Sequence, residues 1–291
     1  MVKKYSDLYL DVRRTLMQLE DVSTAGMMAR QLLARFTGKT QEQILSDLEV
    51  YAGDEIVAKM DDAVRRLLEG EPFAYVLEEW EFYGLKLHVS KDVLIPRDDT
   101  VAVASLAINQ GIFLPQTPRI LDLCTGSGCI GLAIASRIQD ARVTLADISK
   151  EALAVAKRNM LEHKLSGRVN CIQVDALAPA PAVLGKFDMI VSNPPYITRA
   201  EMEELPASVA DFEPHLALFG GEDGLDFYRS IAENYTQALK PGGYLALEYD
   251  PSQGDDICRI LEAKGYTILE RARDYNDRER AVLAQYGRKE D

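Results

Sequence analysis

The chain has 291 residues, of which 47% are hydrophobic and 27% are charged, and its formal net charge is -13. A chain of this length exceeds what one hydrophobic core serves well, so we expect two domains. No apolar stretch approaches the ~18 residues that span a bilayer, the N-terminus has no apolar segment of signal-peptide length, and the acidic balance disfavours wrapping duplex DNA. We therefore expect a cytoplasmic protein that binds neither membrane nor DNA directly, and we expect a monomer.

Residues 1–75 are predicted to form a small helical domain that recognises the substrate. Apolar residues recur at helical spacing from Leu8 to Leu19, from Met27 to Phe36 and from Ile56 to Leu68. Between the last two segments, Thr40 and Gln43 form a capping box that opens a short helix. These helices would hold a protein substrate against the rest of the chain.

Residues 76–92 are predicted to be a β-hairpin linker, with strands 80–83 and 86–89 joined at Gly84-Leu85. From residue 93 to 291 strands alternate with helices, which is typical of an α/β domain with a mostly parallel sheet. A long helix is expected at 226–239. The seven predicted strands are 120–123, 142–146, 169–174, 187–191, 244–247, 266–269 and 281–285, and the last two are expected to close the sheet as antiparallel strands.

A glycine-rich turn follows the first strand of this domain. The strand runs into Cys124-Thr125-Gly126-Ser127-Gly128, and a helical pattern begins at Ile130. This order lets the backbone approach a ligand at a helix N-terminus. No Lys follows Gly128, so the turn is not a phosphate loop of the Lys-Ser/Thr kind. The spacing of Gly126, Gly128 and Gly131 also fits a dinucleotide site, and the turn alone leaves that ligand open.

Three acidic residues lie at or near the ends of successive strands. Asp147 suits the two hydroxyls of a ribose, and Asp175 suits an adenine amino group. Asp122 adds negative charge just before the glycine turn. Two carboxylates would repel a pyrophosphate but attract a nucleoside that carries a sulfonium and no phosphate. The acids therefore favour S-adenosylmethionine over a dinucleotide.

The fourth strand ends in Asn193-Pro194-Pro195-Tyr196. Two prolines fix the backbone there, because each restricts its own φ and the residue before it. The Asn193 side-chain oxygen and the Pro194 carbonyl can each accept one proton of a planar –NH2 group, and the Tyr196 ring can cover its face. Two acceptors would orient the nitrogen and disperse the positive charge that grows on it during alkylation. The tetrad predicts transfer to an amide or an aromatic amine by direct in-line displacement.

These motifs resemble the peptide-chain-release-factor glutamine methyltransferases over nearly the whole chain. The resemblance also includes Leu94-Ile95-Pro96-Arg97, Phe212-Glu213-Pro214, the glycine-rich segment 220–228, Glu248 and residues 273–280. It implies a Rossmann-like domain that transfers a methyl group from S-adenosylmethionine to the glutamine amide in the Gly-Gly-Gln loop of release factors. The catalytic residues would be Asn193, Pro194 and Tyr196, and the substrate would lie against Asn193, Pro194, Pro195 and Tyr196. The cofactor-binding residues would be Asp122, Thr125, Gly126, Ser127, Gly128, Asp147, Ile148, Asp175 and Asn193.

The chain departs from the family pattern at three places. Asp98-Asp99-Thr100-Val101 stands where Pro-Glu-Thr-Glu is usual, Glu78 where glycine is usual, and Tyr249-Asp250 where Ile-Gly is usual. Two alternatives stay open: an amino-methyltransferase acting on another protein glutamine or on adenine or guanine of nucleic acid, and a cofactor-binding protein without catalysis. The scattered histidines and cysteines have no metal-ligand spacing, so no metal is expected.

Overall fold

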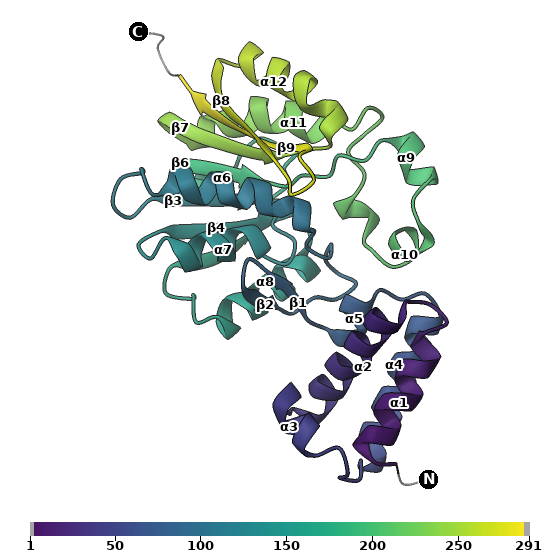
Figure 1. Cartoon of the computed structure of the whole chain (residues 1–291). Helices are drawn as coiled ribbons and strands as arrows, with labels where there is room; N and C mark the ends of the chain where they lie inside the picture. Colours follow the sequence, from purple (N-terminus) through teal and green to yellow (C-terminus); the bar gives the residue numbers. More distant parts are fainter. Residues whose placement is uncertain (1–2, 288–291) are drawn as a thin grey trace. The chain divides into compact units, whose positions relative to one another are not determined.

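The computed structural model describes residues 3–287, which form two compact units. The first unit contains the chain up to Glu79 together with Ala207–Phe212, and the second contains Trp80–Pro206 and the chain from Glu213 onward. Figure 1 traces both units along the sequence. The sequence predicted a boundary near residue 75, and no local pattern indicates that Ala207–Phe212 groups with the N-terminal helices.

The first unit is helical. Its helices are α1 (Tyr5–Leu16), α2 (Val22–Thr37), α3 (Gln41–Ser46), α4 (Asp54–Leu68), α5 (Phe73–Leu77) and α10 (Ala207–Ala210). The predicted capping box of α3 is present, since the Thr40 side chain accepts from the Gln43 N–H and the Gln43 side chain accepts from the Thr40 N–H. Leu8, Leu32 and Met60 are fully buried in the core of this unit. The apolar spacing therefore identified the faces that pack together.

Three apolar residues assigned to those faces are exposed instead. Leu19 is 49% exposed because α1 ends at Leu16, and Leu68, the last residue of α4, is 45% exposed. Met27 is 43% exposed, whereas its neighbour Met28 is 5% exposed, since adjacent helical residues point 100° apart. Glu78 ends α5 with a φ of 56°, in the left-handed region that favours glycine.

The predicted hairpin is present, with its turn one residue earlier than expected. Strands β1 (Trp80–Phe82) and β2 (Leu85–Leu87) pair antiparallel. Tyr83 and Gly84 form the turn, and both have positive φ, as a two-residue hairpin loop of this kind requires. Phe82 and Leu87 are buried in the core of the second unit. The hairpin therefore belongs to the sheet unit.

The second unit contains a seven-stranded sheet in the order β5-β4-β3-β6-β7-β9-β8. Its strands are β3 (Arg119–Leu123), β4 (Arg142–Asp147), β5 (Val169–Gln173), β6 (Phe187–Ser192), β7 (Leu239–Glu248), β8 (Tyr266–Arg273) and β9 (Glu279–Tyr286). The five strands from β5 to β7 are parallel, and β9 is antiparallel to both of its neighbours. The predicted mostly parallel seven-stranded sheet is confirmed. The strand order reverses direction between β3 and β6, where sheets of this type bind ligands.

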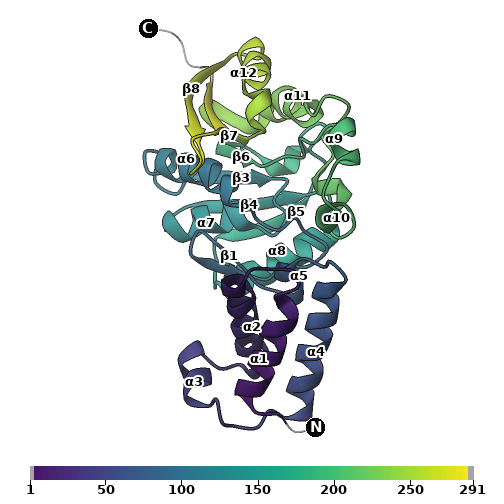
Figure 2. The same cartoon turned by 45° about the vertical axis from the view of Figure 1, so that its right-hand side comes forward.

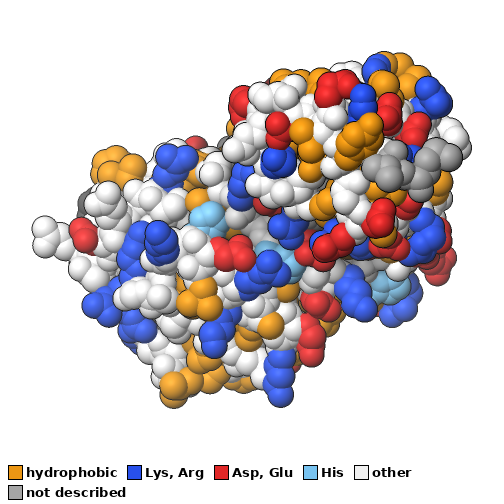
Figure 3. Space-filling view, turned by 90° about the horizontal axis from the view of Figure 1, so that it is seen from below, with side chains coloured by type: hydrophobic (Ala, Val, Ile, Leu, Met, Phe, Trp, Pro, Cys, Tyr) orange, Lys and Arg blue, Asp and Glu red, His pale blue; other side chains and the backbone are white. Residues whose placement is uncertain are grey.

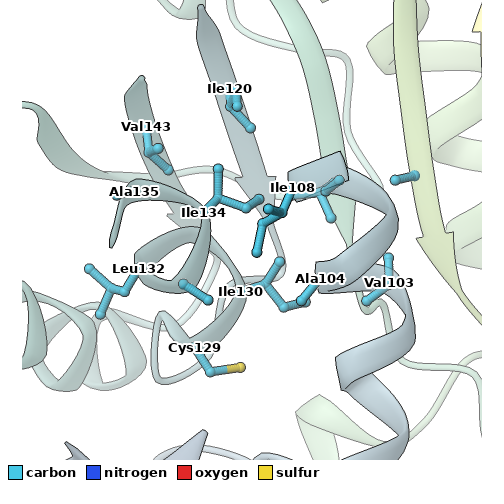
Figure 4. Packing of buried hydrophobic residues seen from close by; sticks show 14 of the residues in the cluster. Val103, Ala104, Ile108, Ile120, Cys129, Ile130, Leu132, Ile134, Ala135 and Val143 are labelled. Carbon is cyan, nitrogen blue, oxygen red and sulfur yellow. The ribbon is translucent and has the colours of Figure 1, made fainter. Parts of the chain in front are cut away.

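Helices cover both faces of the sheet (Figure 2). Buried residues of α6 (Val101–Gly111), α7 (Cys129–Arg137) and α8 (Lys150–Glu162) pack on one face, and Figure 4 shows the α6 and α7 side chains beside Ile120 of β3 and Val143 of β4. Buried residues of α11 (Asp226–Ser230) and α12 (Gly254–Ala263) pack on the other face. A short helix, α9 (Arg199–Glu203), follows β6.

The predicted helix at 226–239 is not regular. After α11 the chain forms a π-helical stretch, Ile231–Tyr235, then a 3-10 turn, Thr236–Ala238. Leu239 already begins β7, which is longer than the predicted strand 244–247 because it extends back through Pro241. A register shift opposite Phe187 and Met189 accommodates this extension.

Three further features of the described residues concern membrane spans, metal ligands and surface charge. Within residues 3–287 no helix is long and apolar enough to cross a membrane. The same described residues contain no group of three or more His, Cys, Asp or Glu side chains that could hold a metal ion. On the face seen in Figure 3, acidic side chains are interspersed with basic ones.

Candidate active site

The carboxyl ends of the parallel strands open onto a cavity of about 190 Å³ in the second unit. Eight of the predicted site residues line it, namely Thr125, Gly126, Ser127, Asp147, Ile148, Asp175, Asn193 and Pro195. The other four, Asp122, Gly128, Pro194 and Tyr196, are not among the residues lining it. The sheet therefore brings together the motifs predicted from the sequence, although not all of their residues line this cavity.

Asp122 holds the glycine turn from beneath. It is fully buried, and its Oδ2 accepts hydrogen bonds from the Thr125 hydroxyl (2.6 Å) and from the Gly131 N–H (2.8 Å). A Cβ at Gly131 would lie 2.8 Å from Asp122 Oδ2 and 2.3 Å from Leu145 Cδ2, so only glycine fits there. Gly126 and Gly128 have φ values of 53° and 84°, which turn the loop sharply into α7.

The charge of Asp122 is smaller than the sequence suggested. Burial raises the pKa of Asp122 to about 7, and only part of this shift is opposed by its two hydrogen bonds. At neutral pH a large fraction of Asp122 is therefore protonated. Asp122 then repels a pyrophosphate less than an ionised carboxylate would. Asp122 Oδ1 and Ser127 Oγ are buried without a hydrogen-bond partner among the described residues.

Asp147 is the last residue of β4, Asp175 follows β5, and both line the cavity. Asp147 Oδ2 accepts from the Gly126 N–H (2.9 Å), and its Oδ1 accepts from the Ser149 N–H (3.0 Å). Burial raises the pKa of Asp147 above its usual value. Asp175 is exposed, and its Oδ1 accepts from the Leu177 N–H (2.8 Å). Both carboxylates keep lone pairs for a ligand that donates hydrogen bonds.

Thr100 and Glu248 lie beside the Asn193 side-chain amide and bear on its orientation. The amide Nδ2 donates to Thr100 Oγ1 (3.3 Å), and both side chains lie close enough to the Glu248 carboxyl to oppose the rise of its pKa. The –NH2 of Asn193 therefore faces the buried Thr100 hydroxyl, and a Glu248 carboxylate, which only accepts hydrogen bonds, favours the same orientation when it is ionised. Asn193 lines the cavity, and its carbonyl oxygen has no donor among the side-chain hydrogen bonds of the described residues, so the predicted acceptor role remains a prediction.

The backbone after Asn193 is clamped by the loop 218–224. The Ile197 N–H donates to the Leu218 carbonyl (2.9 Å), and the Gly220 N–H donates to the Ile197 carbonyl (2.9 Å). A Cβ at Gly220 would lie 2.6 Å from Tyr196 Cα and 2.7 Å from the Pro195 oxygen. The Tyr196 carbonyl also accepts from Gln253 Nε2 (3.0 Å). The tetrad is therefore held by contacts as well as by its prolines.

Several residues near the site have no local sequence pattern that would have predicted their role. Glu213 is 4% exposed and accepts from Arg97 (2.5 Å) and from the Ile95 N–H (3.3 Å), so it fastens the segment before Asp98. Arg280 lies 2.9 Å from Asp99 and 3.2 Å from Asp274.

Thr100 and Glu248 were noted only through the family resemblance, although one signal was available. A single charged residue at the end of the apolar strand 244–247 occupies the same position as the acids after the other strands. In the altered segment 98–101, Asp99 and Thr100 both have partners in this site, and Val101 begins α6.

Comparisons with known proteins match both units. Residues 8–77 match a family described as the PrmC N-terminal domain, and residues 100–209 match the Methyltransferase small domain. A release factor glutamine methyltransferase of Clostridium acetobutylicum is 38% identical over 256 residues, which cover 88% of this chain and 90% of that protein. One of Bacteroides thetaiotaomicron is 37% identical over 245 residues, which cover 81% and 86%. In fold, a methyltransferase structure from Pyrococcus furiosus has a TM-score of 0.51 at 19% identity, covering 78% of this chain and 100% of that one.

Proposed function

The chain belongs to the release factor glutamine methyltransferase family, and on that premise we propose that it methylates the glutamine of the Gly-Gly-Gln loop of a peptide chain release factor. The methyl donor would be S-adenosylmethionine, and the acceptor would be the side-chain amide nitrogen. The orientation of the Asn193 amide carries this proposal, because it presents a carbonyl oxygen at the cavity where a primary amide needs an acceptor.

The cavity residues fit S-adenosylmethionine. Asp147 offers carboxylate oxygens for a ribose diol, and Asp175 offers them for an adenine amino group. Ser127 Oγ, buried and unpartnered among the described residues, is a polar atom that a ligand in the glycine turn would satisfy. Because Asp122 is partly protonated at neutral pH, most of the repulsion toward a pyrophosphate would come from Asp147.

When bound, S-adenosylmethionine supplies an electrophilic methyl group on a sulfonium. The residues of this chain would act by positioning the acceptor nitrogen. Asn193 Oδ1 and the Pro194 carbonyl would each accept one amide proton, and Tyr196 would cover the amide plane. The lone pair of a free amide is delocalised into its carbonyl, so holding both protons favours the geometry in which the nitrogen can attack.

No side chain needs to remove a proton before transfer, because an alkylated amide nitrogen is strongly acidic and loses its proton to solvent. The mechanism therefore needs no general base, and the tetrad contains none. Burial raises the pKa of Tyr196, so its hydroxyl stays protonated and does not serve as one.

The test is methyl transfer from radiolabelled S-adenosylmethionine by the purified chain. Substrates are an intact release factor, the same factor with its Gly-Gly-Gln glutamine changed to alanine, a ribosomal protein fraction and duplex DNA. We expect label in the intact factor and none in the alanine variant. Faster labelling of the ribosomal proteins or of DNA would replace the proposed substrate. S-adenosylmethionine binding without transfer to any substrate would favour a non-catalytic protein.

A further inference from the structure

Glu248 is a buried carboxylate beside the catalytic tetrad. In the parallel pairing of β6 and β7, Ser192 lies opposite Leu247, so the next residues of the two strands, Asn193 and Glu248, are neighbours. Glu248 is 1% exposed, and Thr100, which also touches it, is 2% exposed. Glu248 Oε2 has no hydrogen-bond partner among the described residues. A buried carboxylate with an unsatisfied oxygen is costly and calls for a reason.

The two orientations of the Asn193 amide are not equivalent next to this carboxylate. In the observed orientation, Nδ2 donates to Thr100 Oγ1, and Asn193 lies close enough to Glu248 to lower the pKa of its carboxyl. If the amide were flipped, Asn193 Oδ1 would face an ionised carboxylate, two acceptors in contact. The flipped –NH2 would then face the substrate –NH2, two donors in contact. The two orientations of Asn193 are therefore separated by repulsion on both sides of the amide.

We propose that Glu248, together with Thr100, is a positioning residue that locks the Asn193 amide with its carbonyl oxygen toward the substrate nitrogen. This inference rests on the proposed function for the identity of the substrate nitrogen, and on the buried Glu248–Thr100–Asn193 contacts for the lock itself. Glu248 acts through Asn193 and is not assigned any contact with substrate or cofactor.

The lock depends on the ionisation of Glu248. Burial raises the pKa of Glu248 to about 8, and hydrogen bonds from Thr100 and Asn193 oppose the shift only in part. A protonated Glu248 can donate, and it then tolerates the flipped amide, so the lock strengthens as pH rises through this range. The charged or titratable groups that act on Glu248, or on which it acts, are Arg280, Asp99, Tyr196, Tyr228 and Cys129.

Kinetics of three variants, with one control, test the lock. Glu248→Gln can donate and accept, so it should permit both amide orientations and lower kcat by about 10- to 100-fold, the scale of a misplaced reacting group. Thr100→Val should lose a similar amount, and Thr100→Ser should recover most of it because the hydroxyl returns. KM for S-adenosylmethionine should stay within about twofold in the Glu248 variant. The rise of kcat with pH near 8 should be present in the wild type and absent in Glu248→Gln.

The matched control is Asp188→Asn. Asp188 is a buried carboxylate near the start of β6, the strand that leads into the tetrad, and it binds Lys240 (2.8 Å) and the Arg119 N–H (2.9 Å). Its loss should lower the unfolding midpoint without changing kcat or its pH profile. If Glu248→Gln behaves like this control, Glu248 has only a structural role and the inference fails.

A second readout does not depend on turnover. In protein labelled with [15N]asparagine, the Asn193 side-chain –NH2 resonances should shift with pH near 8, and Glu248→Gln should abolish that shift. A pH-independent resonance in the folded wild type would overturn the inference even if methylation is observed. A wild type that shows the NMR shift but methylates no release factor would instead overturn the proposed function and leave the lock standing.

Discussion

Asn193 is the residue on which the proposed chemistry depends most directly. Asn193→Ala removes the side-chain acceptor at the cavity while the prolines and the loop 218–224 still hold the backbone. We expect methyl transfer to fall by at least ~100-fold, comparable to the loss of one polar group in a preorganised site. Cofactor affinity, measured by calorimetry, should change little. A variant that binds S-adenosylmethionine normally and keeps most of its turnover would show that the tetrad is a structural turn.

Asp147 should determine cofactor binding. Asp147→Ala is expected to weaken S-adenosylmethionine binding by about 1–3 kcal/mol, since hydroxyls of the ligand would lose their acceptor. Asp147→Asn keeps one acceptor oxygen and should lose less, although the Gly126 and Ser149 N–H groups compete for it. Calorimetry with S-adenosylmethionine and with a nicotinamide dinucleotide measures both effects. Tight binding of the dinucleotide alone would contradict the cofactor assignment.

At the scale of elements, the loop 218–224 should support the tetrad as much as the prolines do. Gly220→Ala places a methyl group against the backbone of Pro195 and Tyr196, which cannot move away as a side chain would. We expect a loss of turnover on the order of 100-fold, because small displacements of positioning groups are costly. Gly167→Ala is the matched control, since nothing lies within 4 Å of its added Cβ. Equal activity of the two variants would show that this loop does not position the tetrad.

The elements that the sequence predicted well are those with a local cause. Strands such as Ile120–Leu123 are short apolar runs buried on both faces, and Thr40 and Ser149 cap helices with their own side chains. The turn at Tyr83-Gly84 was misplaced because a tyrosine with positive φ is unusual. The helix 226–239 was read as regular because hydrophobic spacing does not distinguish a π-helical stretch from an α-helix.

The sequence predicted those site residues whose position along a strand is enough to place them at the site. Strand-end residues such as Asp147 and Asn193 could be found because parallel strands place their carboxyl ends at one edge. The contact of Glu248 with Thr100 joins segments 148 positions apart, and no local pattern records it. The sequence predicted that the charge of Asp122 faces the ligand. Asp122 is buried instead by the packing of α7 and β4, and the local sequence does not show that packing.

At the scale of the whole molecule, buried carboxylates should make stability depend on pH. The pKa of Glu248 rises from an ordinary value of 4.5 to about 8, and that of Asp122 from 3.8 to about 7. The unfolded chain releases these protons at lower pH than the folded chain does. Their contribution is therefore full below about pH 4 and is lost as pH rises to about 8.

Urea unfolding at pH 5.5 and 8.5 measures this dependence. The wild type should lose stability between the two values, and Glu248→Gln should lose less, since it has no proton to release there. Parallel losses in the two proteins would show that Glu248 is not protonated in the folded chain at pH 5.5.

The two units should divide recognition from chemistry. A fragment that starts at Glu79 contains the glycine turn, the three strand-end acids and the tetrad, so it should still bind S-adenosylmethionine. It should methylate an intact release factor far more slowly than the full chain, because remote contacts help to position the reacting centre. A short Gly-Gly-Gln peptide should be a poor substrate for both. Equal initial rates on the intact factor would leave the helices a role in stability only.

The helical unit is built from two separate stretches of chain, and this matters during synthesis. Its first stretch ends at Glu79, but Ala207–Phe212 emerge from the ribosome only after most of the sheet unit. At roughly 5–20 residues per second, the N-terminal helices wait roughly 6–25 s for their last segment. A ribosome stalled before residue 207 would therefore carry the helical unit without its last segment.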